Sequence, residues 1–544
     1  MSSIKKLILL PFITASVFAS CAQERYYREA EALTAALRLE QKVGQMVMVG
    51  VPGSRMNRKA ESIITENLPG GIILFGRNLT TFGNNRAFVT DLHDASIRNS
   101  GIPLFISIDQ EGGRVVRIRS GVTQFPGNMA AGISGDCGLV YEWGRILGLE
   151  LRRSGVNMNL APVLDVNNNP SNPVINTRSF GSDPRLVADI GACYVRGIQD
   201  SRCISVGKHF PGHGDTDSDS HYTLPVIRSS MKRLGRIELV PFQKAIAAGV
   251  ECIMTAHVSY PLILGNGDPA TISPLFLTRL LREELKFNGL IITDDLEMAA
   301  ISSREELGEA AVRSILAGAD IVLLSSYGSD LQVIVSAIKR AVALKRISAE
   351  RINESVKRIL EAKIRYGIMT YEEGRIGAGR FIMTDDGEKI LGSAGRVNSE
   401  LSRTGLIYFG DIKLLYPGEN AARIFITSSP RLREILAGKK RNVLCSFPGL
   451  QRCTARGGKI ILYLHVVEPD LNYIKTVAGY CKKRGIDLVV ISSGNPFPLA
   501  ASGIVKAGLL SFSDTDESLR QLGLCLNGRF RPKLDAGLDL GIKK

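Results

Sequence analysis

The chain has 544 residues, of which 44% are hydrophobic and 22% are charged, with a formal net charge of +15. This length allows more than one domain and a large hydrophobic core that does not depend on disulfides. Apart from one short apolar run near the N-terminus, no stretch predicts a membrane-spanning helix, so the composition excludes a protein with several membrane spans.

The first residues predict a secretory signal. Lys5 and Lys6 precede an apolar run at 7–19, and small residues follow it. A basic start, a short apolar stretch and small residues at the cut are typical of a signal peptide, which we place at residues 1–22. We therefore expect an exported protein.

The end of this segment resembles a bacterial lipobox. The letters Ala-Ser-Cys, with Phe18 just before them, imply cleavage before Cys21 and lipidation of Cys21. Ordinary cleavage after Ala22, which leaves a soluble protein, is the alternative. The expected location is the cell membrane or outer membrane through a lipid anchor, or the periplasm.

Positive charge gathers in clusters such as 439–441 and 482–484. Such clusters are typical of a solvated surface, and on an exported protein they also suit contact with anionic phospholipid or peptidoglycan carboxylates. Nucleic acid is not an expected partner.

Eight short apolar runs alternate with helical patterns over the first two thirds of the chain. Apolar strands that alternate with amphipathic helices are typical of parallel strands buried on both faces. Eight such units predict an α/β fold with a (β/α)8 TIM-type barrel at residues 30–370. The predicted strands are 46–50, 71–75, 104–109, 156–165, 204–209, 252–257, 289–294 and 320–324, and the predicted helices include 139–154, 185–200, 229–248 and 275–285.

Polar residues stand where these predicted strands end. In a barrel of this kind the active site lies at the carboxyl ends of the strands, so we expect these side chains to converge. Strands three to seven end, in order, in Asp109, Asp165, Lys208 with His209, His257, and Asp294 with Asp295.

The segment 208–221 is the densest in groups that can transfer protons. It holds three of the six histidines, His209, His213 and His221, together with three aspartates. Prolines and glycines around His213 predict a loop. Titratable loop residues on a rigid scaffold are where catalysis usually takes place.

A second unit follows the barrel pattern. Residues 352–368 predict an amphipathic helix, and 371–395 is a predicted linker. From 396 to 544 strands and helices alternate again, which predicts a smaller α/β sandwich domain with a mostly parallel sheet. The predicted strands there are 424–427, 442–447, 459–466, 487–492 and 508–512.

The cysteines show no metal-type spacing. Cys203 and Cys252 begin buried strands, which suits free thiols that act as small apolar side chains. Export permits disulfides among the others, but the sequence does not pair them.

Four segments carry a resemblance to a known family. They are 108–115, 178–181, the histidine loop 208–221 and 293–298. With these motifs the chain resembles glycoside hydrolase family 3, and within it the bacterial β-N-acetylglucosaminidases, over roughly residues 35–370. The loop ending Asp-Ser-His is specific to that branch and is absent from the β-glucosidase branch. The resemblance implies a retaining glycosidase without a cofactor or a metal.

Retaining glycoside hydrolysis needs a nucleophilic carboxylate and a proton donor. Asp294 fits the nucleophile because it ends a barrel strand that fixes its position. Its neighbour Asp295 points to the other side of an extended chain, and periodicity alone leaves both candidates open. The family pattern has the nucleophile at the first of the two aspartates, which favours Asp294.

The resemblance assigns the role of general acid/base to His221, with Asp219 as its partner. Residues two apart in an extended loop project to the same side, so Asp219 can orient the His221 ring and stabilise its protonated form. A histidine also titrates near neutral pH without deep burial. A solvated loop residue is the alternative for His221.

The matching motifs also imply which residues hold the sugar. Charged side chains make strong hydrogen bonds to hydroxyls. The implied set is Asp109, Arg117, Arg178, Lys208 and His209. A structural ion pair is the alternative for the two arginines. We interpret His213 as bracing its own turn, His257 as lining the site without a catalytic role, and 111–113 as shaping its loop.

Other functions stay open at this level. The loop's histidines and aspartates can also ligate a metal in a barrel hydrolase, although Asp294 would then have no role. A phosphorylase remains possible because a histidine repels an anionic acceptor less than a carboxylate does. A β-glucosidase-type hydrolase and a sugar-binding lipoprotein without catalysis are the remaining alternatives.

The scarcity of tryptophan bears on the kind of substrate. A long polysaccharide cleft usually offers several aromatic platforms, and Trp143 is the single tryptophan. The sequence therefore predicts an exo-acting, retaining β-N-acetylhexosaminidase that removes terminal N-acetylglucosamine from cell-wall fragments or other glycosides. Its expected partners are that carbohydrate and, through the lipid anchor, a membrane.

Overall fold

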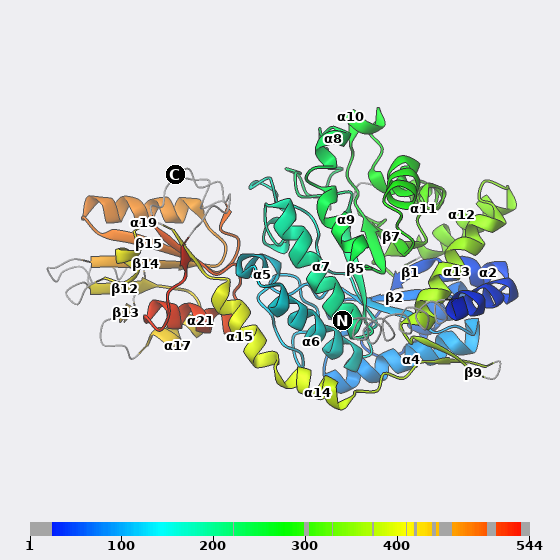
Figure 1. Cartoon of the computed structure of the whole chain (residues 1–544), viewed down its shortest axis with the longest axis horizontal. Helices are drawn as coiled ribbons and strands as arrows, with labels where there is room; N and C mark the ends of the chain where they lie inside the picture. Colours follow the sequence, from blue (N-terminus) through cyan, green and yellow to red (C-terminus); the bar gives the residue numbers. More distant parts are fainter. Residues whose placement is uncertain are drawn as a thin grey trace, which may run out of the picture.

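The computed structural model describes residues 24–220, 222–298, 304–328, 330–372, 375–409, 411–417, 422–437, 442–444, 446, 460–497 and 507–534. The predicted signal peptide, Cys21 and His221 lie outside these residues. The described chain forms two lobes, a large one with a barrel and a smaller one with an open sheet (Figure 1). Helices α14 (Asp385–Gly392) and α15 (Ala394–Thr404) run between them.

The larger lobe is a closed barrel of eight strands, which confirms the predicted TIM-type fold. Neighbouring strands pair in parallel, and β1 pairs with β8 to close the barrel. The side chains of these strands are almost all buried, as their apolar runs predicted. The strands are β1 (Val47–Gly50), β2 (Gly71–Leu74), β3 (Phe105–Ile108), β4 (Met158–Asn159), β5 (Ile204–Phe210), β6 (Cys252–Thr255), β7 (Leu290–Asp295) and β8 (Ile321–Leu324).

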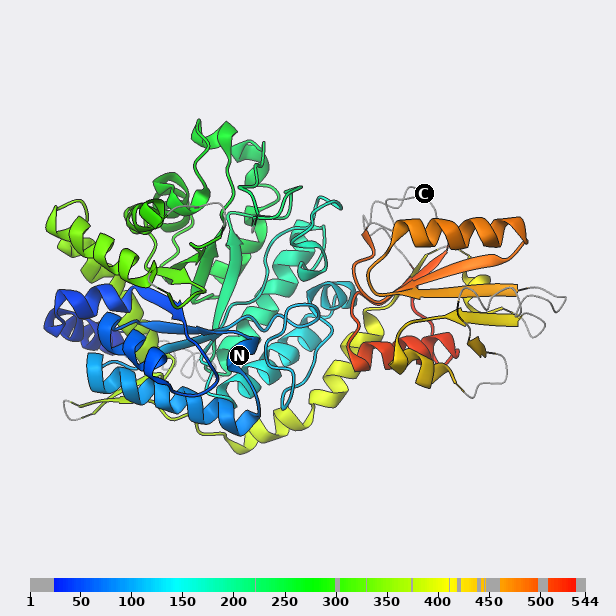
Figure 2. The same cartoon turned by 180° about the vertical axis from the view of Figure 1, so that it is seen from behind.

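Helices surround the barrel, as the view from behind shows (Figure 2). They present apolar faces to the strands and form two buried clusters with them, a large one and a smaller one around α9 and η4. The main ones are α2 (Leu39–Gln45), α3 (Arg58–Asn67), α4 (Phe82–Ser100), α6 (Cys137–Arg153), α7 (Pro184–Asp200), α9 (Leu239–Ala247), η4 (Leu275–Glu284), α11 (Arg304–Ala317), α12 (Asp330–Ala343) and α13 (Ala349–Arg365).

Strand β4 is much shorter than the predicted strand 156–165. Beyond Asn159 the chain continues beside β5 without a regular ladder, through a hydrogen bond from the N–H of Val206 to the carbonyl of Ala161 and an isolated bridge between Val163 and Lys208. Pro162 lacks a backbone N–H, so it cannot donate to a regular ladder. The apolar run therefore continues as buried, irregular chain.

The predicted helix 229–248 is divided into α8 (Met231–Leu234) and α9. Gly235 ends the first helix, and Pro241 lies in the first turn of the second. A proline is tolerated in a first turn, whereas inside one continuous helix it would remove a hydrogen bond and clash with the preceding turn.

A disulfide links the first residue of α6 to α7. It joins Cys137 and Cys193, whose Cα atoms are 5.7 Å apart. Cys203 and Cys252 are free and buried, as predicted for these two. Tertiary contact thus supplies the pairing that the sequence left open.

The smaller lobe holds a seven-stranded mixed sheet of order β13-β12-β14-β15-β16-β11-β17, in which the β11–β16 pair alone is antiparallel. Helix α19 covers one face, and α17 and α21 cover the other (Figure 1). The bounds are β11 (Ile407–Phe409), α16 (Ile412–Leu415), β12 (Ala422–Ile426), α17 (Pro430–Leu436), β13 (Asn442–Leu444), β14 (Ile460–Val466), α19 (Leu471–Lys483), β15 (Asp487–Ser492), β16 (Gly508–Leu510), α21 (Asp516–Leu526) and β17 (Lys533–Leu534).

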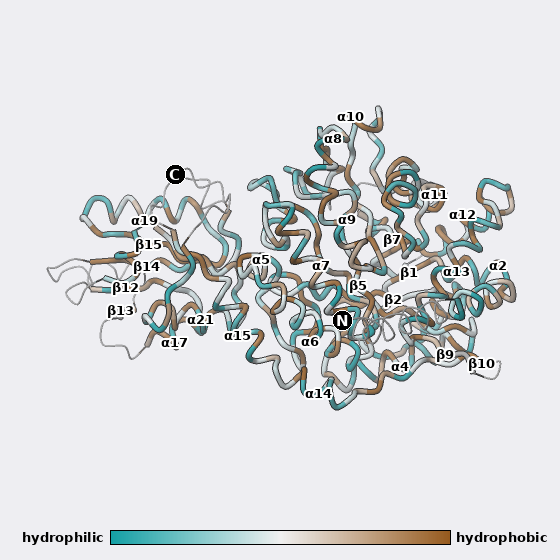
Figure 3. The backbone as a smooth tube through the Cα atoms, viewed as in Figure 1, coloured by the Kyte–Doolittle hydropathy of each residue, from teal (hydrophilic) through white to brown (hydrophobic). Residues whose placement is uncertain are grey.

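Alternation along β14 explains this layering. Ile461 and Tyr463 face the side of α17 and α21, whereas Leu462 and Leu464 face α19. Successive strand side chains point to opposite faces, so a strand that is apolar throughout is buried on both. The hydrophobic centre of this lobe is visible along β14 and β15 (Figure 3).

The two lobes share a small hydrophobic cluster. Met129 and Ile133 of α5 (Asn128–Ser134) pack with residues of the smaller lobe, including Phe497 and Phe512. The Nζ of Lys533 adds hydrogen bonds to the carbonyls of Ile133 and Ser134, at 2.8 and 2.9 Å.

The predicted linker 371–395 contains the end of β9 (Met369–Glu372), β10 (Arg375–Ala378) and α14, rather than only loop. In the described part of the chain, no helix combines the length and apolar character needed to cross a membrane.

Candidate active site

Lys208 joins the end of β5 to two charged side chains that follow β3. It lies near the end of β5 and is buried, and its Nζ is 2.8 Å from Asp109 Oδ1 and 2.7 Å from Glu111 Oε1. Both acids follow β3. Arg117 reaches back from the same loop, with Nη2 3.3 Å from Asp109 Oδ2. Three predicted binding residues are therefore one network.

Arg178 joins this network from the segment that precedes α7. Its guanidinium binds Glu111 with two parallel bonds, Nη2 to Oε1 at 2.9 Å and Nε to Oε2 at 3.0 Å. This geometry agrees with the ion-pair alternative for Arg178. A direct bond from Arg178 to substrate stays a prediction.

The opposite charges in the network shift one another's pKa values toward the ionised forms. Burial would raise the pKa of Glu111, but Arg178 and Lys208 outweigh it and hold that pKa well below its usual range. Burial would lower the pKa of Lys208, but Asp109 and Glu111 raise it above its ordinary value. Glu111 and Lys208 are thus ionised at neutral pH, and charged groups of this kind make strong hydrogen bonds to hydroxyls.

Asp165 orients His209 and the start of the histidine loop. This buried carboxylate has Oδ2 2.7 Å from His209 Nδ1, and its Oδ1 accepts the N–H of His213 at 2.7 Å. Burial acts to raise the pKa of Asp165, but the two imidazoles outweigh it and lower that pKa. The carboxylate therefore fixes the His209 ring at the end of β5.

Asp295 is bound by the backbone at the end of the barrel. Its Oδ1 accepts the N–H groups of Glu297 and Ser325, each at 3.1 Å. Burial raises its pKa above the ordinary value. The Asp295 carboxylate therefore links the end of β7 to the end of β8 through these hydrogen bonds.

Asp294 has a different environment from its neighbour. One of its carboxylate oxygens accepts the N–H of Asp295 at 2.8 Å. Burial acts to raise the pKa of Asp294, but the imidazoles of His209 and His257 outweigh it and lower that pKa. The pKa of Asp294 is thus shifted toward the ionised form that a nucleophile needs, whereas the pKa of Asp295 is shifted in the opposite direction.

His213 lies inside the loop that it was predicted to brace. Its ring nitrogens are 3.0 Å from the hydroxyl of Thr216 and 3.1 Å from that of Ser220. Burial lowers the pKa of His213 to about 4, so the ring is neutral at pH 7. A side chain at Gly214 would collide with the carbonyl of Val166, which explains a glycine beside this histidine.

The rest of the loop contains the predicted dyad. Asp219 is half-buried, and its backbone carbonyl accepts the N–H of Tyr222 at 3.0 Å. His221 lies outside the described residues, so its position relative to Asp219 stays a prediction. Asp215, in the same loop, pairs with Arg233 of α8 at 2.9 Å.

His257 is fully buried and uses both of its ring nitrogens. Nδ1 lies 2.8 Å from the hydroxyl of Thr271, and Nε2 lies 2.9 Å from the carbonyl of Asp295. This agrees with a lining role at the end of β6 rather than with proton transfer.

Three of the six candidate metal ligands of the loop have separate partners. His209 is bound to Asp165, His213 to two hydroxyls, and Asp215 to Arg233. Within the described ranges, no three His, Cys, Asp or Glu side chains are grouped as metal ligands.

Sequence reasoning missed the role of Glu111. It treated 111–113 as a turn that shapes the loop, whereas the Glu111 side chain is 2% exposed and binds two of the predicted site residues. Its partner Arg178 comes from 67 residues downstream. Its position just after Asp109 is the one sequence signal that favours it.

Barrels of this build act at the carboxyl ends of their strands, and glycosidases among them work with carboxylates held there. Residues 38–362 match the family model described as the glycosyl hydrolase family 3 N terminal domain. The chain therefore belongs to glycosyl hydrolase family 3, which confirms the resemblance seen in its motifs.

Named relatives agree with this assignment. The chain is 37% identical over 317 residues to Beta-hexosaminidase A of Pseudoalteromonas piscicida, a match that covers 54% of this chain and 53% of that protein. It is 34% identical over 284 residues to a Beta-hexosaminidase of Nitrosospira multiformis, covering 51% and 79% of the two chains. The chain thus spans about half the length of the first relative.

A solved structure resembles both lobes. The family 3 β-N-acetylglucosaminidase from Paenibacillus sp. superimposes with a TM-score of 0.80 at 35% identity. The match covers 92% of this chain and all of the other. The two-lobed arrangement is therefore shared with that enzyme.

Proposed function

We propose that the chain is an exo-acting, retaining β-N-acetylhexosaminidase that removes terminal N-acetylglucosamine from cell-wall fragments or other glycosides. The names of the relatives support the sugar. The observation that carries the proposal is Asp294, an ionised carboxylate at the end of a barrel strand, which lies near the Lys208 network. That network offers both donors and acceptors to sugar hydroxyls.

The first proposed step forms a glycosyl ester. The Asp294 carboxylate attacks the anomeric carbon, and the bond from that carbon to the leaving oxygen breaks. Protonated His221 gives its proton to the leaving oxygen, so the aglycone departs as a neutral alcohol. Asp219 stabilises and orients the His221 ring.

The second proposed step releases the sugar. Neutral His221 takes a proton from water while the water oxygen attacks the anomeric carbon. The ester bond to Asp294 breaks, which restores the carboxylate and the protonated imidazole. Two inversions return the original anomeric configuration.

The sugar is held by the predicted binding residues. Asp109 accepts hydrogen bonds from hydroxyls, and Arg117 and Lys208 donate them. His209, oriented by Asp165, adds a further contact. Arg178 acts mainly through Glu111, whose position it fixes.

A chromogenic assay tests the proposal. We expect release of nitrophenol from the β-N-acetylglucosaminide and little from the β-glucoside, with β-N-acetylglucosamine as the first product by NMR. Phosphate should not become part of the product, and a chelator should leave the rate unchanged. A preference for the glucoside, a sugar phosphate, an α-anomer or chelator-sensitive activity would each contradict a named part of the proposal.

We also propose export and a lipid anchor at Cys21. The lipobox-like sequence supports the anchor, and the Cys137–Cys193 disulfide suits an oxidising compartment. The mature protein should enter the detergent phase on phase separation, and Cys21→Ser should release it or block its processing. A wild-type protein found wholly in the aqueous phase, beginning after Ala22, would favour the ordinary signal peptide.

A further inference from the structure

A cavity of about 860 Å³ lies on the side of the barrel, away from the site described above. It is enclosed by α4, the end of α6 and the segment that follows β10. Asn157 lines the cavity and directly precedes β4, so the cavity lies toward the amino ends of the strands. We call it the Arg152 pocket, after a buried arginine in its wall. Its walls include Val89, His93, Arg152 and Phe381.

Arg152 is the unusual group in this pocket. It is only 8% exposed, and its buried Nε has no hydrogen-bond partner among the described residues. The charged or titratable groups that act on it are Cys203 and Arg202, neither of which is a carboxylate. Its guanidinium stands over the ring of Phe381, 5.2 Å from the centroid. A buried cation without an anion is costly, because it has lost its water and gained no counter-charge.

His93 adds a second donor to the same pocket. Its Nδ1 accepts the N–H of Leu104 at 3.2 Å, so the neutral ring carries its proton on Nε2. Burial, together with Lys363 and Arg152, lowers the pKa of His93 to about 4, and the ring is therefore neutral at pH 7. The inner wall of the pocket thus offers hydrogen-bond donors.

The rim of the pocket is also positive. Three arginines stand on it and are exposed, whereas a single acid, Asp94, lines it. The three are Arg86, Arg153 and Arg380. This charge favours the approach of an anion.

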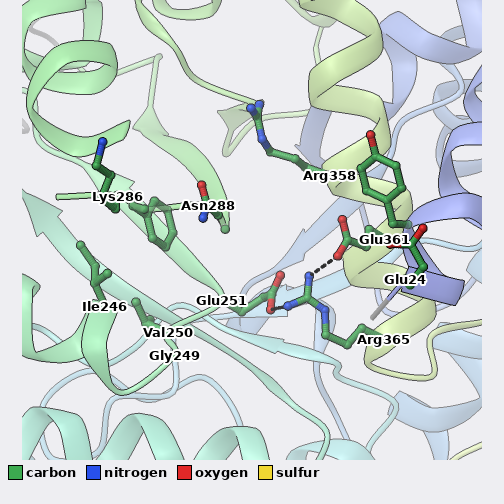
Figure 4. Close-up of a pocket in the computed structure, with 13 residues that line it drawn as sticks. Glu24, Ile246, Gly249, Val250, Glu251, Lys286, Asn288, Arg358, Glu361 and Arg365 are labelled. Carbon is green, nitrogen blue, oxygen red and sulfur yellow. Dashed lines mark hydrogen bonds and ion pairs between the residues drawn. The ribbon is translucent and has the colours of Figure 1, made fainter. Parts of the chain in front are cut away.

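A second pocket in the barrel lobe does not have this excess of positive charge. It has a volume of about 500 Å³ and lies where β6 and β7 begin (Figure 4). Its Arg365 is paired with two carboxylates, Glu251 at 3.1 Å and Glu361 at 3.2 Å. Arg365 thus has acidic partners, whereas no carboxylate is among the described groups that act on Arg152.

We propose that the Arg152 pocket binds an organic monoanion, a carboxylate carried on an apolar body. The planar guanidinium can hold both oxygens of a carboxylate, and one buried positive charge balances one negative charge. The walls formed by Val89, Ile97 and Phe381 cover an apolar body of the ligand. This site is separate from the proposed hydrolase chemistry.

The test uses the full chain and sodium hexanoate as the probe. Isothermal titration calorimetry should show saturable binding of one hexanoate per chain. Hexanamide has the same size but no charge and should bind roughly tenfold or more weakly, since hydrogen bonds to charged groups contribute that much. Inorganic phosphate should bind more weakly than hexanoate because it lacks the apolar body. Equal binding of the acid and the amide, or tighter binding of phosphate, would overturn the proposal.

A pair of variants locates the site. Arg152→Met keeps an apolar stem but removes the charge, and it should weaken hexanoate binding roughly tenfold or more. The neighbouring Arg153→Met removes an exposed charge from the same helix and should change binding less than about threefold. Without ligand, Arg152→Met should melt no lower than the wild type, because an unpaired buried charge has been removed.

Two further variants show whether hexanoate binds in the Arg152 pocket or elsewhere. Asp109→Asn, which alters the sugar site, should bind hexanoate as the wild type does. If Arg152→Met does not fold, Phe381→Ala should still fold, because this ring is half-buried, and it should weaken binding severalfold. Unchanged binding in a folded Arg152→Met, or in Phe381→Ala, would show that hexanoate binds elsewhere.

Discussion

Replacement of Glu111 by glutamine should damage both stability and activity. The Glu111 carboxylate is 2% exposed and accepts one charge-assisted bond from Lys208 and two from Arg178, all between 2.7 and 3.0 Å. Glutamine has the same shape, but its NH2 group faces these cations and cannot accept from them. Removing one partner of a buried ion pair costs about 3–5 kcal/mol. Because Lys208 keeps Asp109, we expect the lower end, about 3 kcal/mol.

The chain offers a matched control on its surface. Glu309 and Arg346 form the same two-bonded arrangement, with Nη1 2.9 Å from Oε2, but their side chains are 47% and 45% exposed. Exposed pairs contribute about 0–1 kcal/mol, so Glu309→Gln should cost less than about 1 kcal/mol. Burial and the additional bond from Lys208 are then what separate the two variants.

The single tryptophan gives an assay for the barrel alone. Trp143 is fully buried in the barrel core, so its fluorescence during urea unfolding at pH 7 follows that lobe. Activity should fall mainly through a raised KM, because Lys208 and Arg178 are displaced rather than removed. Equal stability losses in Glu111→Gln and Glu309→Gln, or a loss below about 1 kcal/mol in both, would refute this reasoning.

The stability that the Glu111 ion pairs contribute should depend on pH. The pKa of Glu111 is held below its ordinary value in the folded chain. Its contribution is therefore present in full above the ordinary glutamate pKa near 4.5 and is lost progressively below it. The stability gap between the wild type and Glu111→Gln should narrow as the pH falls below that value.

Three further predictions follow from the site and the barrel. Asp294→Asn should lower turnover roughly a thousandfold or more on every substrate, because it removes the nucleophile, whereas Asp295→Asn should be milder; the reverse order would contradict the assignment. His221→Ala should slow natural glycosides far more than nitrophenyl substrates, and azide should rescue the nitrophenyl reaction at its second step; equal losses without rescue would mean that His221 only binds or folds the loop. Burial raises the pKa of Glu251 from 4.5 to about 7. Between these two values the folded chain holds a proton that the unfolded chain has lost, so stability should fall by up to about 3 kcal/mol as pH rises through this window. Glu251→Gln should remove that slope in the Trp143 unfolding assay, and an unchanged slope would show that another group causes it.

The strand-end rule located part of the site without any coordinates. Asp109, Lys208 and Asp294 each close an apolar run, and the closed parallel barrel brings the ends of all eight runs to one side. The order of the strands along the chain is enough to predict this convergence. It did not reveal Glu111, because the position of a side chain within a loop does not show whether it is buried or which cation lies beside it.

The length of β4 also shows a difference between what the sequence predicts and what the tertiary structure decides. The run 156–165 is mostly apolar, and it is buried throughout, but only Met158–Asn159 forms regular strand. Hydrophobicity predicts burial, whereas regular pairing also needs a donor at every second position, which Pro162 lacks. The predicted helix 229–248 was divided for a related reason, at Gly235 and before Pro241.

The sequence by itself determined the eight-unit barrel, the second α/β lobe and the family, because these depend on local periodicity and on short motifs that can be read along the chain. The tertiary structure alone decided how burial and neighbouring charges shift the pKa of each site residue. It distinguished Asp294 from Asp295, paired Cys137 with Cys193, and buried Arg152 with no carboxylate among the described groups that act on it. Charge state and pairing depend on burial and on atoms within a few ångströms, and those atoms come from distant parts of the chain.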